Sequence, residues 1–305
     1  MMNRQQELIE QITTLKREKN AVILAHNYQP IEVQAAADVT GDSLGLSIEA
    51  AKTKADLIVF CGVRFMAESA KILSPEKKVL LPRREAGCPM ADMITSEQAR
   101  RMKAEHPGAP LVLYVNSSAD VKAECDICCT SGNVLKVIRS LPNETILMAP
   151  DRNLANYAKR MIPEKNYVIH DGFCPTHEIM RADDITAARA EHPEAVVVAH
   201  PECRTEVLDL ADEICSTSGM IAFCGKNPAR EFIIGTEITM VDVLAKKYPA
   251  KRFYPALIFS SCGNMRMTRL VDLAEALEKE QHEIHIEESI RLRAYDSVKR
   301  MIELV

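Results

Sequence analysis

Short, continuously apolar segments alternate with longer amphipathic stretches along the whole chain. Three of the apolar segments run directly into a polar cluster, at residues 21–28, 111–116 and 195–202. Runs of this length that are rich in Val, Ile and Leu are typical of strands buried on both faces of a parallel sheet. Intervening stretches such as residues 44–54 and 134–140 have the amphipathic pattern and length of crossover helices. The pattern therefore predicts an α/β protein with short parallel sheets.

Four kinds of landmark recur at matched intervals along the chain. The polar residues that follow the three apolar segments, His26, Tyr114 and His200, lie 88 and 86 residues apart. An aspartate follows each of them after twelve residues, a hydroxyl follows five residues later, and a cysteine comes further on: Asp38, Asp126 and Asp212; Ser43, Ser131 and Thr217; Cys88, Cys174 and Cys262. A shared register over two intervals indicates three homologous units.

Each unit is expected to run strand, helix, strand, helix, strand. This predicts three homologous αβα sandwich domains around a pseudo-threefold axis, with boundaries at 1–108, 109–193 and 194–305. A helix at Arg4–Glu18 would complete the first unit, and a helix at 286–304 would complete the last unit or, alternatively, pack back on the first. Since no Gly-, Ser- or Pro-rich linker separates the units, we expect one compact body.

Composition narrows the class of protein. Of the 305 residues, 47% are hydrophobic and 27% are charged, which is typical of a globular chain. The apolar stretches fall short of the roughly 20 residues that a membrane helix needs. The net charge of −5, without a dense basic run, argues against nucleic acid as a partner. The polar N-terminal residues do not follow a secretory pattern, so we expect a cytoplasmic protein.

Polar side chains at the strand ends predict a shared cavity. Ligands of parallel α/β units lie beyond the carboxyl ends of the strands. Three such ends that meet at an axis would surround one space with these residues: His26, Tyr28, Tyr114, Asn116, His200 and Glu202. A single histidine after a strand is most often structural, but the threefold recurrence favours a site.

The recurring hydroxyl residues stand where a following helix should begin. Ser43, Ser131 and Thr217 could therefore expose helix N–H groups to a phosphate or carboxylate. The alternative is ordinary N-capping of the helices by these side chains. The sequence leaves both interpretations open.

The ten cysteines divide into two groups. Cys88, Cys174 and Cys262 occupy matched positions, one in each unit, and could point at one centre. Three thiolates without a fourth favour an iron–sulfur cluster with one open iron, or a zinc site with an open position. The Cys125-x-x-Cys128-Cys129 motif has no further ligands to complete a metal site and no counterpart in the other units, so we interpret it as structural.

A set of longer motifs extends over nearly the whole chain. They are Ala-His26-Asn-Tyr28-Gln, Ala-Asp38-Val-Thr-Gly-Asp-Ser43-Leu, Cys61-Gly-Val-Arg-Phe-Met-Ala-Glu68, Ala-Gly-Cys88-Pro-Met-Ala, Tyr114-Val-Asn116, Thr130-Ser131-Gly-Asn, Gly172-Phe-Cys174-Pro-Thr-His177, His200-Pro-Glu202-Cys, Ser216-Thr217-Ser-Gly-Met, Gly235-Thr-Glu237 and Cys262-Gly-Asn-Met. With these motifs the chain resembles the quinolinate synthase family, the A protein of de novo NAD biosynthesis. One departure is Cys215, where the family is expected to carry Gly.

The resemblance implies a reaction and a cofactor. Iminoaspartate and dihydroxyacetone phosphate would condense to quinolinate with loss of phosphate and water, in a transferase and dehydratase reaction. A [4Fe–4S] cluster held by Cys88, Cys174 and Cys262 would present an open iron as a Lewis acid. An L-aspartate oxidase or dehydrogenase would supply the unstable imine.

The resemblance also implies a set of site residues. Substrate contacts carried over by matching motif are His26, Ser43, Tyr114, Val115, Asn116, Ser131, His200, Pro201, Glu202 and Thr217. Catalytic roles are implied for Tyr28, Glu202, His200 and His177, with Glu202 and Tyr28 in proton transfer.

Two other classes of protein compete with this interpretation. One is a zinc hydrolase that uses the same three thiolates, and the other is a non-catalytic binder of dicarboxylates or sensor of iron–sulfur status.

Overall fold

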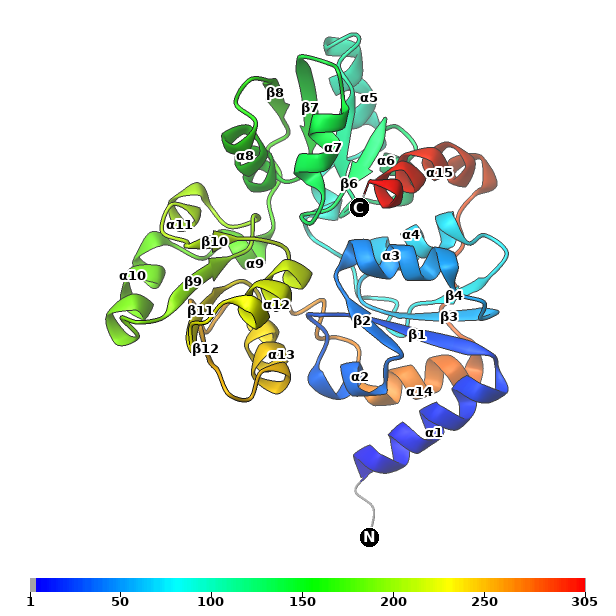
Figure 1. Ribbon diagram of the computed structural model, residues 1–305. Coiled ribbons are helices and arrows are strands. Elements are labelled where there is room, and N and C mark those ends of the chain that lie inside the picture. The colour runs from blue at the N-terminus through cyan, green and yellow to red at the C-terminus, as the bar shows by residue number, and fades with distance from the viewer. Residues whose placement is uncertain (1–3, 305) are drawn as a thin grey trace.

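Three separate four-stranded sheets, each wholly parallel, form the framework of the computed structural model, which describes residues 4–304 (Figure 1). Figure 1 shows the three sheets with their helices arranged around a common centre. The predicted fold class, three αβα sandwiches with short parallel sheets, is confirmed. Within residues 4–304, no helix is both long and apolar enough to cross a membrane.

The three sheets share one strand order. Their strands are β1 (Ala21–His26), β2 (Val39–Gly41), β3 (Leu57–Cys61) and β4 (Lys78–Leu80); β5 (Leu111–Tyr114), β6 (Ile127–Cys129), β7 (Thr145–Ala149) and β8 (Asn166–Ile169); and β9 (Val196–Ala199), β10 (Glu213–Ile214), β11 (Glu231–Gly235) and β12 (Arg252–Pro255). The orders are β2-β1-β3-β4, β6-β5-β7-β8 and β10-β9-β11-β12. The chain therefore reverses its direction of winding after β2, β6 and β10, which places a switch point between the first and third strands of each sheet. Ligands of open α/β sheets bind at such switch points.

Helices connect the strands and cover the sheets. They are α1 (Arg4–Glu18), α2 (Ile31–Ala36), α3 (Ser43–Lys52), α4 (Arg64–Leu73) and the 3-10 turn η1 (Ala91–Met93); α5 (Ser96–Glu105), α6 (Ala119–Lys122), α7 (Val134–Ser140) and α8 (Arg152–Met161); α9 (Pro175–Glu178), α10 (Ala182–Glu191), α11 (Thr205–Leu208), α12 (Thr217–Lys226) and α13 (Thr239–Lys247); and α14 (Leu270–Lys279) and α15 (Glu288–Glu303). In the first unit, apolar residues of α1, α2 and α14 pack against one face of the sheet.

Each unit has one strand more than the sequence predicts. The additional strands, β2, β6 and β10, are only two or three residues long. A segment this short shows no hydrophobic periodicity, and β2 is also partly exposed. The predicted strand–helix–strand–helix–strand order is therefore wrong by one helix and one strand in each unit.

The recurring aspartates bind the first strand of each sheet to the helix that precedes it. Each carboxylate accepts a hydrogen bond from a first-strand N–H and pairs with a basic residue of that helix: Asp38 with Ile23 and Lys16, Asp126 with Leu111 and Lys103, and Asp212 with Val197 and Arg189. The N–H to carboxylate distances are 2.9, 2.8 and 2.8 Å. This shared contact explains why the aspartates keep their register.

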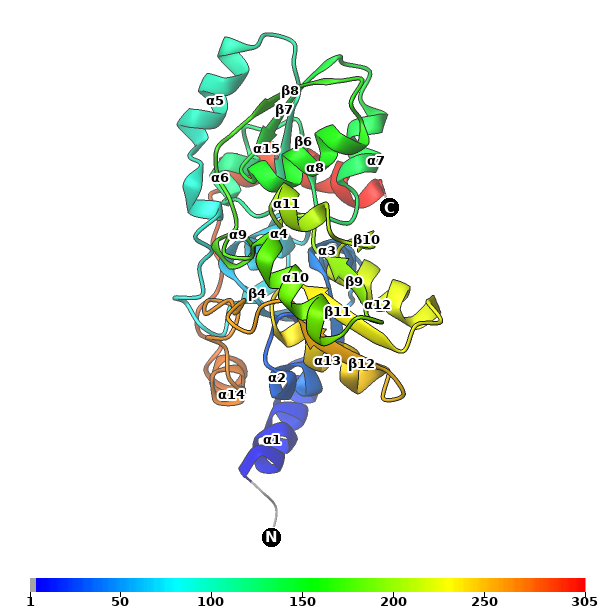
Figure 2. The ribbon, with the colours of Figure 1, turned by 90° about the vertical axis from the view of Figure 1, so that its left-hand side faces the viewer.

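The C-terminal helices leave the third unit. Helix α14 packs beside α1 against the first sheet (Figure 1, Figure 2), and α15 lies between the first and second units, against α4, α6 and β6. Its buried face consists of Ala294, Ser297, Val298 and Met301, and Asn133 donates a hydrogen bond to the Met301 carbonyl. Of the two alternatives for 286–304, completion of the last unit is wrong. The contacts of α15 agree with packing back on the first unit, and its apolar stripe also covers a surface of the second unit.

The aspartate contact makes a measurable contribution to stability. In Asp212→Ala the buried Val197 N–H loses its acceptor, and we expect the free energy of unfolding to fall by about 2 kcal/mol. Asp212→Asn keeps an acceptor oxygen and loses only the exposed pair with Arg189, so it should cost less than about 1 kcal/mol. Urea denaturation of the two variants tests the difference. An equal loss in both would show that the ion pair, and not the strand contact, stabilises the unit.

Candidate active site

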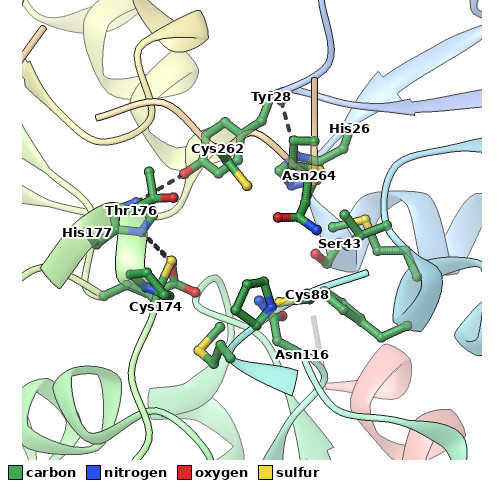
Figure 3. A pocket seen from close by; sticks show the side chains of 18 of the residues that line it. His26, Tyr28, Ser43, Cys88, Asn116, Cys174, Thr176, His177, Cys262 and Asn264 are labelled. Carbon is green, nitrogen blue, oxygen red and sulfur yellow. Dashed lines mark hydrogen bonds and ion pairs between the residues drawn. The ribbon is translucent and has the colours of Figure 1, made fainter. Parts of the chain in front are cut away.

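A cavity of about 260 Å³ lies where the three units meet. Most of the residues predicted from the strand ends, hydroxyl positions and cysteines line it: His26, Tyr28, Ser43, Cys88, Tyr114, Asn116, Ser131, Cys174, His177, His200, Glu202, Thr217 and Cys262. Figure 3 shows labelled side chains from several separate parts of the chain facing this space. The two other predicted residues, Val115 and Pro201, are buried but do not line the cavity.

His26 and His200 have the same local geometry in the first and third units. The Nδ1 atom of His26 accepts a hydrogen bond from the Tyr28 N–H at 3.1 Å, and Nδ1 of His200 accepts one from the Glu202 N–H at 3.3 Å. This arrangement places the ring proton on Nε2 in both residues. Burial lowers the pKa of His26 to about 4 and that of His200 to about 3. Both side chains are therefore neutral hydrogen-bond donors at physiological pH.

Glu202 is the buried carboxylate at the centre of the site. Its Oε2 atom lies 2.8 Å from His177 Nδ1 and 3.6 Å from His200 Nδ1, and it also bonds to the Tyr114 hydroxyl. Burial raises the pKa of Glu202, but these neighbours outweigh burial and bring it to about 2. Burial and the Glu202 charge raise the pKa of Tyr114 well above its ordinary value. At neutral pH the site thus combines a charged carboxylate with a protonated phenol.

A chain of hydrogen bonds connects Tyr28 to Glu202. The Tyr28 hydroxyl lies 2.6 Å from Thr236 Oγ1, which in turn lies 2.8 Å from His177 Nε2. One set of donors satisfies every contact: Tyr28 donates to Thr236, Thr236 to His177, and His177 through Nδ1 to Glu202. Thr236 was not among the predicted site residues, although the Gly235-Thr-Glu237 motif directly after β11 carried a signal for it.

The hydroxyl residues at the helix starts are not the helix caps. Asp42 caps α3 by accepting the Gly45 N–H at 2.9 Å, and Ser216 caps α12 by accepting the Gly219 N–H at 3.3 Å. Ser43 and Thr217 are the first residues inside these helices and line the cavity. The capping alternative is therefore wrong for these two positions, because the preceding residue performs that function.

The three predicted cysteines face the cavity from separate segments (Figure 3). Each sulfur accepts backbone N–H bonds from the turn that follows it: Cys88 from Met90 and Ala91, Cys174 from His177, and Cys262 from Asn264 and Met265. These N–H groups stabilise thiolates, whereas burial disfavours them and raises the pKa of Cys88 to about 12. A cation bound between the sulfurs would offset that cost, so the donor set fits a metal centre.

A second possible ligand group overlaps with the first. Ligand atoms of Cys174, His177 and Glu202 all lie within 4.8 Å of one another. His177 Nδ1 is 3.1 Å from the Cys174 sulfur as well as 2.8 Å from Glu202. Cys174 therefore belongs both to the three-cysteine set and to a compact Cys–His–Glu group.

The sequence did not single out the apolar wall of the cavity. Val63, Phe65, Met66, Met90 and Met265 line it. Each lies within one of the quoted motifs, but an apolar side chain by itself is typical of an ordinary core residue. Asp42, Thr176 and Asn264 were also missed, although each lies within a motif that contains a predicted residue. Cys125, Cys128 and Cys129 lie outside the lining.

Fold and site together define a three-unit α/β protein with a central cysteine-lined cavity. The profile of the family described as "Quinolinate synthetase A protein" matches residues 10–303, and the chain belongs to this family. It is 52% identical over 303 residues to a quinolinate synthase of Geotalea uraniireducens, covering 98% of both chains. It is 48% identical over 305 residues to one of Thermodesulfovibrio yellowstonii, covering 100% of both, and 50% identical over 298 residues to one of Methanosarcina barkeri, covering 98% of both.

The buried neutral histidines predict a pH dependence of stability. Above pH 6.5, His26 is neutral in the folded and the unfolded chain. Between pH 6.5 and about 4 only the unfolded chain binds the proton. The free energy of unfolding therefore falls as pH falls, by up to about 1.4 kcal/mol per pH unit from this residue. In His26→Gln the slope measured by urea denaturation between pH 6 and 5 should be shallower by about that amount. Identical slopes in both proteins would contradict the buried neutral state of His26.

Proposed function

We propose that this chain forms quinolinate, a precursor of NAD, from iminoaspartate and dihydroxyacetone phosphate, with release of phosphate and water. The observation that carries the proposal is the meeting of three cysteines, neutral histidine donors and the buried, charged Glu202 in a single cavity. The names of the relatives support the same activity. Because iminoaspartate is unstable, an L-aspartate oxidase or dehydrogenase must produce it shortly before use.

Cys88, Cys174 and Cys262 are the residues that would hold a [4Fe–4S] cluster. Their sulfurs face one space, receive N–H bonds, and are joined by no fourth cysteine in the lining described for residues 4–304. When bound, the cluster would supply an open iron that acts as a Lewis acid in dehydration. The remaining chemistry belongs to the side chains of the chain itself.

The polar lining suits two anionic substrates. His26 presents a neutral Nε2–H, and His200 Nε2 lies 3.2 Å from Ser131 Oγ, so that it orients this hydroxyl. Hydroxyl and amide groups of Ser43, Ser131, Thr217, Tyr114 and Asn116 supply further hydrogen bonds to carboxylate and phosphate oxygens. Ser43 and Thr217 open helices whose N-terminal N–H groups favour negative charge. Val115 and Pro201, which were predicted as substrate contacts, lie in the chain between lining residues, Val115 between Tyr114 and Asn116 and Pro201 between His200 and Glu202.

Proton transfer is assigned to Glu202 and Tyr28. Glu202 remains charged although its side chain is buried, so its oxygen can remove a substrate proton. His177 Nδ1 and Nε2 and the Thr236 hydroxyl connect Glu202 to the Tyr28 phenol. Tyr28 can therefore donate its phenol proton to a leaving oxygen, and its hydrogen bond to Thr236 positions the phenol for this step. His200 acts beside Glu202 by holding Ser131 and contacting substrate.

Loss of the central carboxylate should slow turnover strongly while iron and sulfide stay bound. In Glu202→Gln we expect quinolinate formation to fall at least about 100-fold, since a positioned general base contributes that much or more. The measurement is chromatographic detection of quinolinate together with iron and sulfide content. Glu206→Gln makes the same chemical change on the exposed start of α11 and should leave turnover intact. Wild-type turnover in Glu202→Gln with unchanged iron and sulfide would remove its proposed role.

A mononuclear metal enzyme is the second candidate, favoured by the compact Cys174–His177–Glu202 group. Metal analysis of anaerobically purified protein separates the two. We expect about four irons and four sulfides per chain, lost in Cys88→Ser and in Cys262→Ser. Zinc without sulfide, retained in both variants because neither cysteine belongs to the compact group, would instead favour a hydrolytic metal site.

A further inference from the structure

A buried carboxylate stands at matched positions in the second and third units. Asp151 follows β7 by two residues and Glu237 follows β11 by two residues, 86 residues apart. The corresponding position in the first unit, 88 residues before Asp151, is Val63. Asp151 and Glu237 are 2% and 0% exposed, and neither lines the cavity. Neither was assigned a role in substrate binding or proton transfer.

Asp151 uses its two oxygens on two different backbone groups. Oδ1 accepts the Leu154 N–H at 2.6 Å and so caps helix α8. Oδ2 accepts the N–H of Cys174 at 3.0 Å, which lies 23 residues further along the chain. The side chain therefore ties the start of α8 to a cysteine of the cavity.

Glu237 repeats this arrangement in the third unit. Oε2 accepts the N–H of Thr239, the first residue of α13, at 2.8 Å. Oε1 accepts the N–H of Cys262 at 3.2 Å, 25 residues further along the chain. The longer side chain of Glu reaches the same two kinds of partner as Asp151.

Helix capping alone does not account for both oxygens. A cap requires one acceptor atom, and Ser or Asn performs it as well as Asp does. In the first unit, α4 begins after Val63 with no side-chain cap at all. The second oxygen of Asp151 and of Glu237 therefore has a separate function at the cysteine.

We propose that Asp151 and Glu237 are positioning residues that fix the backbones of Cys174 and Cys262, so that both sulfurs are already aimed when the cluster binds. This inference rests on the proposed iron–sulfur site. Partners in the second coordination shell typically change metal affinity by about 10–100-fold when removed. The Cys88 segment lacks such a carboxylate, because Val63 offers no acceptor. A buried carboxylate thus holds the backbone of Cys174 and that of Cys262, and the backbone of Cys88 has no such partner at the matched position.

The test separates the cysteine contact from the helix cap. Asp151→Ser retains an N-cap oxygen for α8 but is too short to hold Cys174, and Glu237→Gln replaces one acceptor oxygen by an amide donor. After anaerobic reconstitution of the full chain, we expect iron release to a chelator to be about 10-fold faster than in wild type. We also expect altered g-values in the electron paramagnetic resonance spectrum of the reduced cluster. Thr95→Ala, which removes the exposed cap of α5, is the matched control and should lower stability without changing release or spectrum.

The outcomes distinguish this inference from the proposed function. A wild-type protein that binds no iron and sulfide after reconstitution would overturn the proposed cluster itself. A wild-type protein with an intact cluster, whose release rate and spectrum are matched by both variants, would overturn only the positioning role. Faster release in Thr95→Ala of the same size as in Asp151→Ser would show a general effect of stability and would also overturn it.

Discussion

All strands of a parallel sheet end at the same edge, and the rest of this structure depends on that constraint. Three short sheets around one centre bring the ends of β1, β5 and β9 to a single space, although the residues concerned are more than 80 positions apart. Each sheet needs its first strand in the correct place, and an aspartate bound to a first-strand N–H provides this in every unit. The position of the cavity therefore follows from the topology of the three sheets and not from any one side chain.

Burial gives the cavity its electrostatic character. Burial disfavours the charged form of a side chain, and it holds His26 and His200 neutral. Glu202 stays charged because His177 Nδ1 and the Tyr114 hydroxyl donate hydrogen bonds to it and outweigh burial. The carboxylates of Glu202 and Asp42, set among neutral donors and three thiols, leave a deficit of positive charge, which a metal centre would supply. The same reasoning explains why the thiol pKa values are raised in the protein alone.

Much of the fold and most of the site follow from sequence register, because the repeat places equivalent residues at equivalent strand ends. The features that were not predicted depend on atomic contacts that the hydrophobic periodicity of a sequence does not reveal. Strand β10 has two residues and no pattern. Ser43 was one candidate for the cap of α3, but the adjacent Asp42 caps this helix. Only the backbone geometry shows which of two neighbouring polar residues is the cap. The partner of α15 is a surface formed by two units, so a local amphipathic pattern predicts a helix without predicting its neighbour.

The matched positions at which the three units carry different residues determine the chemical character of the cavity. Where the first and third units place His26 and His200, the second has Tyr114, which bonds to Glu202. Where the second and third units place Asp151 and Glu237, the first has Val63, which lines the apolar wall of the cavity instead. A strictly symmetric cavity would offer three equal donors and no single base. Under the proposed function two different substrates bind in defined orientations, so the repeat would supply the scaffold and the positions at which the units differ would supply the direction of the reaction.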